Sequence, residues 1–308
     1  MKYSELNSVF ADLKAIPTSF STIPERKKAL LHLDEIFGEA DSETTTVLGN
    51  FYRKQVDNAL TEISSYTGKT PRLWKFYSSG IIIKSDKLTM AIDVNDGCVP
   101  VQGRTKITLR RDQIRKLAIL IDEYYCTHSH VDHLSPALCD ALARRNKIIV
   151  MPAEAIRRWL IKGAVPAENF HSDHCKTFLN WQGDASGGLD CAMYLLTLSN
   201  KRTVMVRGDI YHKEGFDACI AQLHTWKASV DYAFLTPYFS DGDDPVEVLS
   251  KKFNCRFIPI HEWEFGHRVF GQKGPATQCY AELYKKFDSL YQSGRAQILS
   301  WGESIALD

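Results

Sequence analysis

A short apolar segment that runs into a cluster of histidines constrains this fold more than any other feature of the chain. Residues 122–127 have the pattern of a strand, and the six residues that follow contain His128, His130, Asp132 and His133. A neutral imidazole nitrogen is a good ligand for zinc or iron, and a carboxylate can bind a metal or orient a metal-bound water. The run predicts a metal site, because a surface loop rarely gathers these side chains by chance.

Strand-like and helix-like segments alternate from about residue 73 onward. Apolar segments with strand character lie at 76–83, 88–94, 147–151, 176–181, 192–198, 202–207, 233–236 and 256–260. Segments with helical spacing lie between several of them, at 111–120, 136–145, 153–162 and 246–253. Such alternation is typical of an α/β domain in which helices cover a sheet.

The N-terminal part of the chain has a different pattern. Apolar residues recur at helical spacing in 6–13, 30–37 and 46–63, and no cluster of metal ligands occurs there. We therefore predict a helical N-terminal extension at residues 1–70 and a metal-binding domain at residues 71–308. The extension is expected to pack on that domain, to contact a partner or to cover the site.

Composition argues against several classes of protein. Lysine plus arginine, 38 residues, nearly balances aspartate plus glutamate, 37 residues, so no strong field favours nucleic acid or a membrane surface. No stretch approaches the roughly 20 apolar residues of a membrane span, and the N-terminus has no signal-peptide core. The eight cysteines form no CxxC pair, which argues against a zinc ribbon. We expect a cytoplasmic protein with no nucleic-acid or membrane partner, and a homo-oligomer is left open.

Two further strand-like segments end in residues that bind metals. Residues 204–208 lead into Asp209, and residues 257–260 lead into His261. Loops at strand tips form the sites of α/β scaffolds, so these side chains can be combined with the histidine cluster. A fourth segment, at 177–185, runs from a strand into a glycine-rich turn.

In their order and spacing, these segments resemble the metallo-β-lactamase fold superfamily of metallohydrolases. Residues 128–133 match its HxHxDH signature, Asp209 matches its bridging aspartate, and His261 matches its last histidine. Asp93, at the end of another strand, matches an early aspartate that supports the site without binding metal. The resemblance covers residues 73–308 and implies an α/β fold, a four-layer αββα sandwich of two mixed β-sheets, here with an N-terminal helical extension.

The metal ligands that the resemblance implies come from all three strand tips. One metal would be held by His128, His130 and Asp209. The second would be held by Asp132, His133, Asp209 and His261. Asp132 is also the implied catalytic residue, which would orient the nucleophile or bind the second metal. The implied cofactor is a divalent metal, one or two zinc ions, with manganese or iron as alternatives.

One ligand of the superfamily is missing from this sequence. A further metal-binding histidine normally lies between the first cluster and the bridging aspartate, and here Gly183 occupies that position. Loss of one neutral donor should weaken the first site, although three protein ligands and a water still make a catalytic zinc site. The residues that could substitute are Asp184, His171, His174 and His212, of which His171 and His174 are expected to be plain surface residues.

The implied function is that of a hydrolase. A metal-bound hydroxide would attack an ester, lactone or phosphodiester bond of a small molecule, with His212 and His267 as candidates for the leaving-group acid. Residues 229–237 and 258–261 resemble the closing segment of the L-ascorbate-6-phosphate lactonase-like branch of metal-dependent hydrolases. Two alternatives stay open, an iron-dependent oxidoreductase similar to the sulfur dioxygenases of this fold, and a metal-depleted, non-catalytic binding protein, which Gly183 motivates.

Overall fold

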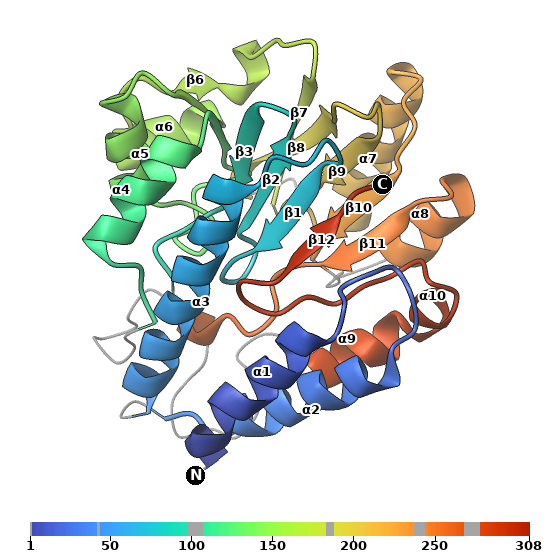
Figure 1. Ribbon diagram of the computed structural model, residues 1–308. Helices are drawn as coiled ribbons and strands as arrows, with labels where there is room; N and C mark the ends of the chain where they lie inside the picture. Colours follow the sequence, from blue (N-terminus) through green and yellow to red (C-terminus); the bar gives the residue numbers. More distant parts are fainter. Residues whose placement is uncertain (1, 42–43, 98–106, 183–187, 237–243, 268–277) are drawn as a thin grey trace.

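The computed structural model describes residues 2–41, 44–97, 107–182, 188–236, 244–267 and 278–308 (Figure 1). Two β-sheets pack face to face, and helices cover their outer faces. These layers follow from the sequence, because strands that are apolar on both faces must be covered on both. None of the described helices is both long and apolar enough to cross a bilayer.

The first sheet is mixed. Its strands are β1 (Arg72–Lys75), β2 (Ile81–Ser85), β3 (Leu88–Ile92), β4 (Glu123–Tyr125), β5 (Ile148–Met151), β6 (Val165–Pro166) and β12 (Ser304–Ala306). They lie in the order β12-β1-β2-β3-β4-β5-β6. The pairs from β12 to β3 are antiparallel, and those from β3 to β6 are parallel. The parallel part brings the carboxyl ends of β3 and β4 to the same edge.

The second sheet is also mixed. Its strands are β7 (Cys175–Trp181), β8 (Asp190–Thr197), β9 (Thr203–Val206), β10 (Tyr232–Leu235) and β11 (Arg256–Pro259), in the order β11-β10-β9-β8-β7. Strands β9, β10 and β11 are parallel, whereas β7, β8 and β9 pair antiparallel. The carboxyl ends of β9, β10 and β11 therefore share one edge. The predicted sandwich of two mixed sheets is confirmed.

Alternation along the strands builds the core between the sheets. In β2, Ile81 and Ile83 belong to the hydrophobic cluster that both sheets share, whereas Ile82 belongs to the cluster under the outer helices. In β8, Tyr194 faces the shared cluster and Met193 faces the helices on the other side. Because successive residues of a strand face opposite sides, each buried strand supplies two layers of the core.

Three of the outer helices, α5, α7 and α8, begin with a side-chain cap. Helices α4 (Arg111–Leu120), α5 (Pro136–Ala143) and α6 (Ala153–Trp159) lie on the first sheet, and α7 (Lys213–Thr225) and α8 (Pro245–Lys252) lie on the second. The side chains of Ser135, His212 and Asp244 accept backbone N–H groups at the starts of α5, α7 and α8. Such caps satisfy N–H groups that have no partner within the helix, which explains where these helices start.

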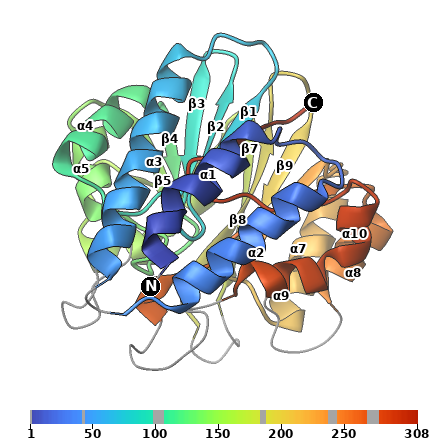
Figure 2. The same cartoon turned by 60° about the horizontal axis from the view of Figure 1, so that its bottom comes forward.

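The N-terminal residues form the predicted helices, which are α1 (Leu6–Ala15), α2 (Pro24–Gly38) and α3 (Thr45–Ser65). Figure 2 shows α2 beside α9 (Tyr280–Lys286), which is followed by α10 (Asp288–Gln292). Arg26 forms a buried ion pair with Glu303, and the ring of Phe37 stacks on that of Trp301 at 4.9 Å between ring centres. The first helices of the chain are thus tied to its last residues.

The structure differs from the sequence prediction around β1, β2 and β12. The sequence predicts a strand from residue 76, but β2 begins at Ile81. Residues 76–80 form a turn in which the Gly80 N–H binds the Tyr77 carbonyl at 2.9 Å. Ser78 has a φ of 51°, which takes it out of the extended region. Strands β1 and β12 were not predicted, because each is short and its pairing joins distant parts of the chain.

Candidate metal centre

Five strand ends surround one place in the molecule. Strands β3 and β4 end at one edge of the first sheet, and β9, β10 and β11 end together at an edge of the second. The polar residues that follow these strands are Asp93, the 128–133 cluster, Asp209, Thr236 and His261. The carboxyl ends of parallel strands are where α/β proteins bind their ligands. The topology thus brings together residues that lie far apart in the sequence.

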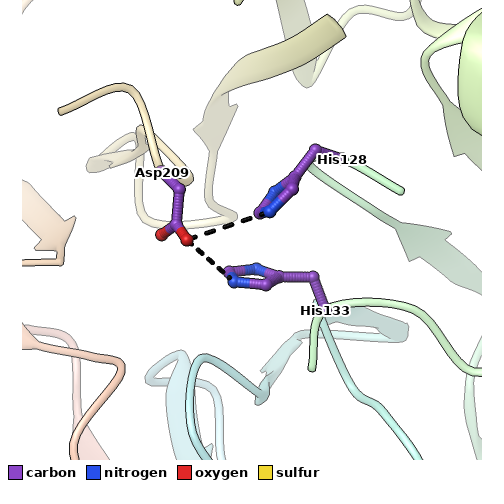
Figure 3. Close-up of side chains that lie close together, drawn as sticks. All are labelled: His128, His133 and Asp209. Atoms are coloured by element: carbon purple, nitrogen blue, oxygen red, sulfur yellow. Dashed lines mark ion pairs between the residues drawn. The ribbon is translucent and has the colours of Figure 1, made fainter. Parts of the chain in front are cut away.

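Asp209 lies at the centre of the cluster. Its Oδ2 atom lies 3.8 Å from His128 Nε2 and 3.3 Å from His133 Nε2 (Figure 3). His261 Nε2 lies 3.6 Å from the same oxygen. The other oxygen, Oδ1, accepts a hydrogen bond of 2.8 Å from the Thr236 hydroxyl, which fixes the rotation of the carboxylate. Imidazole nitrogens carried by both sheets therefore face one carboxylate oxygen.

Asp132 and His130 complete the set of predicted ligands. Asp132 Oδ2 lies 2.9 Å from His261 Nε2 and 3.7 Å from His133 Nε2. His130 Nδ1 lies 3.1 Å from His128 Nε2. His130 is partly exposed, whereas the other predicted ligands are buried. The residues that the sequence selects as ligands thus meet in one cluster with a single partly open side chain.

Asp93 holds this cluster from behind. Its Oδ1 accepts the Thr127 N–H at 2.7 Å, and its Oδ2 accepts the Thr127 hydroxyl at 2.8 Å. Oδ2 also lies 2.9 Å from His133 Nδ1. An ionised carboxylate only accepts hydrogen bonds, so Nδ1 of His133 carries a proton and Nε2 is the nitrogen turned toward Asp209. A second carboxylate behind a metal-binding histidine acts in this way, which agrees with the supporting role that the resemblance implies.

The charges of the cluster depend strongly on one another. Burial lowers the pKa of His128 well below its ordinary value, and the neighbouring His133 adds to this effect. Burial also opposes a charge on His133 and His261, but the carboxylates outweigh it. The pKa of His133 therefore rises well above its ordinary value, and that of His261 rises to about 9. Although burial opposes it, these imidazoles hold the pKa of Asp132 and that of Asp209 below the ordinary value.

The donors fit a divalent metal. His133 Nε2 is buried and faces the Asp209 carboxylate at 3.3 Å without the geometry of a hydrogen bond. Imidazole nitrogen and carboxylate oxygen are ligands for zinc, and also for iron or manganese. In the described residues, ligand atoms lie within 4.8 Å of one another in two groups, His128 with His133 and Asp209, and Asp132 with His261 and His267. A divalent cation would neutralise the carboxylates and give His133 Nε2 a metal bond in place of its contact with Asp209.

Comparisons with known proteins bear on the fold. No protein-family model matches the chain, and no curated protein matches its sequence. Similar solved structures include a possible metal-dependent hydrolase from Veillonella parvula DSM 2008, with 11% identity, a TM-score of 0.54, and coverage of 79% of this chain and 100% of that one. Isothiocyanate hydrolase from Delia radicum gut bacteria matches with 16% identity, a TM-score of 0.52, and coverage of 77% and 99%. A metallo hydrolase from Ignicoccus hospitalis KIN4/I matches with 14% identity, a TM-score of 0.51, and coverage of 78% and 99%.

These similarities, together with the two mixed sheets and the HxHxDH motif after β4, decide the architecture. The chain has the metallo-β-lactamase fold. At 11 to 16% identity the solved structures show a shared fold and do not extend to a shared substrate. The fold that the sequence predicts is confirmed, and its assignment to the lactonase-like branch stays a prediction.

Within the metallo-β-lactamase fold, three other histidines considered as ligands lie elsewhere. His212 caps α7, since its Nδ1 accepts the Gly215 N–H at 3.2 Å, and its Nε2 lies 3.3 Å from a backbone carbonyl. Both of its ring nitrogens are therefore engaged. His174 pairs with Glu123 at 2.8 Å, at the opposite end of β4 from the cluster. His171 is exposed, as the sequence predicts.

A cavity of about 490 Å³ opens over the cluster. Its lining includes His130, Asp209 and His261 from the cluster and, around them, Gln182, Tyr211, Thr236, His267 and Gln278. Neither lysine nor arginine occurs among the described residues of this lining. The volume suits a small molecule. Gly183 and Asp184, at the position of the missing histidine, lie outside the described residues.

Sequence reasoning missed several residues that support the cluster. Thr127 and Thr236 each lie at the end of a predicted strand and contact a carboxylate of the cluster. Their position at a strand tip, which also marks Asp209 and His261, could have identified them. Glu264 is buried beside the cavity, but no pattern in the sequence sets it apart. Its role depends on three-dimensional contacts alone.

Proposed function

We propose that this protein is a metal-dependent hydrolase that cleaves an ester or lactone bond of a small molecule. The observation that carries the proposal is the meeting of imidazoles and carboxylates from both sheets beside a cavity of small-molecule size. The chain also shares its fold with a metallo hydrolase. Fold alone does not give an activity, so the donor set is the stronger support.

The side chains have separate parts in this proposal. His128, His130 and Asp209 would hold one metal ion, and Asp132 and His261 would hold a second, with His133 and Asp209 between the two. When bound, a divalent metal lowers the pKa of a water from 15.7 to about 7 and polarises a carbonyl oxygen. Asp132 lies 2.9 Å from His261, which with His133 lowers its pKa, and it would orient the attacking water, as the resemblance implies.

The lining favours an uncharged carbonyl substrate over a phosphodiester. Phosphate oxygens are usually met by arginine or lysine, and the described lining has neither. Gln182, Thr236 and Gln278 offer neutral groups that donate and accept hydrogen bonds, which suits the oxygens of an ester or a lactone. Phosphodiesters therefore rank second among the substrates that we propose.

The decisive experiment combines metal analysis with a substrate panel. Purified protein would be analysed by mass spectrometry for zinc, manganese and iron and then assayed on esters, lactones and phosphodiesters. We expect His128→Ala and Asp209→Ala to lose bound metal and to lower hydrolysis by at least about 100-fold, beyond the 10- to 100-fold loss typical of outer-shell changes. The matched control is His171→Ala, the same kind of change at an exposed histidine.

Two results would contradict the proposal. Iron as the bound metal, with oxygen uptake and no hydrolysis, would support an oxidoreductase of the same fold. Wild-type protein without stoichiometric metal, and ligand variants without effect, would support a non-catalytic binding protein.

A further inference from the structure

His267 lies at the end of the short helix η4 (Phe265–His267), close to the metal cluster. Its ring stacks on that of His261, with ring centres 5.8 Å apart and an angle of 27° between the planes. One ligand atom from each of Asp132, His261 and His267 lies within 4.8 Å of the other two. His267 also lines the cavity over the cluster. It therefore stands beside two residues that the proposed metal centre already uses.

Glu264 fixes the orientation of this imidazole. Its Oε2 lies 2.8 Å from His267 Nδ1 and accepts the backbone N–H of His267 at 2.7 Å. Its Oε1 accepts the Gly266 N–H at 2.8 Å and the Tyr77 hydroxyl at 3.1 Å. Only 1% of Glu264 is exposed, so these donors hold a buried carboxylate in one place. Nδ1 of His267 is engaged by that carboxylate, and Nε2 is the nitrogen that remains to bind a ligand.

In a metal-binding histidine, one ring nitrogen usually binds the metal and the other is held by a hydrogen-bond partner. Such an imidazole almost always donates its second N–H to a carboxylate, a carbonyl or a water, which sets the tautomer and the ring orientation. The carboxylate of Asp93 is this partner for Nδ1 of His133, and the carboxylate of Glu264 is this partner for Nδ1 of His267. An exposed ion pair adds little to stability, whereas Glu264 is buried and its two oxygens contact His267, Gly266 and Tyr77.

His267 lies on the side of the cluster where the second metal is expected. Asp132 Oδ2 lies 2.9 Å from His261 Nε2 and 3.7 Å from His133 Nε2, and His261 Nε2 lies 3.6 Å from Asp209 Oδ2. These are the four ligands that the resemblance implies for the second metal. His267 does not belong to that set, yet it offers a ligand atom within 4.8 Å of those of Asp132 and His261.

We infer that His267 is a further metal ligand of the second site, beside Asp132 and His261, and that Glu264 is its positioning residue. The inference rests on the proposed function only in requiring a metal at this centre. It adds one imidazole to the four ligands that the resemblance implies for this ion.

The inference is tested by metal titration, with no use of activity. Wild type, His267→Ala, Glu264→Gln and the control His171→Ala would be stripped with a chelator and titrated with Co²⁺ and Zn²⁺ by calorimetry. The Co²⁺ absorption spectrum would be recorded in parallel, because it depends on the number and kind of ligands. We expect two equivalents in wild type and in the control. His267→Ala should lose the second metal equivalent or bind it at least tenfold more weakly. Glu264→Gln should still bind two metal equivalents, with a smaller loss of affinity for the second.

The outcomes separate this inference from the proposed function. If His267→Ala binds two metal equivalents with wild-type affinity and an unchanged Co²⁺ spectrum, the inference alone is overturned. The same holds if wild type binds one metal equivalent and the substitution leaves that binding unaffected. Wild type that binds no metal would contradict the proposed function itself. His267 is about half exposed, so its loss should leave the fold intact. If His267→Ala does unfold, His267→Leu, which also lacks a donor, enters the same titration with the same expected loss.

Discussion

Asp93→Asn tests how the metal centre is held with almost no change in volume. The carboxylate accepts the Thr127 N–H and lies 2.9 Å from His133 Nδ1. An amide keeps one oxygen for Thr127 but presents an NH₂ group to His133. The imidazole then takes the other tautomer, with its proton on Nε2, the nitrogen that faces Asp209. The substitution therefore reverses both hydrogen bonds at Oδ2, the one with His133 and the one with the Thr127 hydroxyl, and it blocks one metal-binding nitrogen.

The expected losses differ for metal binding and for stability. Outer-shell partners of metal-binding histidines are typically worth 10- to 100-fold in affinity, or about 1.4–2.7 kcal/mol. In the metal-free protein, a hydrogen bond to a charged group, worth about 1.5–3 kcal/mol, gives way to a neutral one worth about 0.5–1.5 kcal/mol. The change at the His133 bond alone should therefore lower the free energy of unfolding by about 1–1.5 kcal/mol, and the fold should persist.

Calorimetric titration of chelator-treated protein with zinc measures the first quantity, and urea unfolding of the same sample measures the second. The matched control is Asp122→Asn. Asp122 accepts the Thr89 N–H at 3.0 Å and the Lys147 ammonium at 2.9 Å, at the end of β4 away from the cluster. This control should lose some stability and keep wild-type zinc affinity.

Two results would contradict a change of tautomer at His133. Zinc affinity within twofold of wild type in folded Asp93→Asn protein would refute it, because the reversed hydrogen bond would then have no effect on His133. Equal losses of affinity in Asp93→Asn and Asp122→Asn would also refute it, since the effect would then be general destabilisation.

Three further predictions concern the metal, the pH and a helix cap. Metal at 100 times its Kd should raise the free energy of unfolding by about 2.7 kcal/mol over chelator-treated protein in urea titrations, and no difference would contradict a bound metal. In metal-free protein, His261 has a raised pKa of about 9, so its charged form stabilises the fold. This contribution to the free energy of unfolding is complete below pH 6.5 and is lost as the pH rises through 9. A flat profile of urea midpoints against pH would contradict this sign. His212→Ala removes the cap of α7 and should lower the free energy of unfolding by about 0.5–2 kcal/mol in the same assay, without loss of metal. Loss of metal would show that His212 is a ligand.

Much of the architecture could be predicted from local sequence. The short apolar segments marked the buried strands, and the polar residues directly after them marked the site. Asp209 and His261 could be combined with the histidine cluster for this reason, because parallel strands that end at one edge bring their following residues together. Strand order did not have to be known for that step.

The rest depends on contacts that leave no local pattern. Strand β1 pairs with β12, which places Leu73 opposite Ile305. Both strands are short, and the sequence of neither one identifies the strand with which it pairs. His212 and His267 each follow a predicted ligand by a few residues, but one caps a helix and the other lines the cavity. Spacing cannot separate these roles, because the direction of a side chain is set by the turn that carries it. Glu264 escaped notice for the same reason.

The attachment of the first helices to the last residues has a consequence for how the protein is made. Arg26 and its partner Glu303 are 277 positions apart, and Asp34 in α2 accepts a hydrogen bond of 2.7 Å from the Trp263 indole. A ribosome releases α2 long before these partners exist, so the part of α2 that they cover stays open until they have been made. Contacts of such sequence separation slow folding. The segment with His261, which carries Trp263, is therefore expected to reach its final place late in folding.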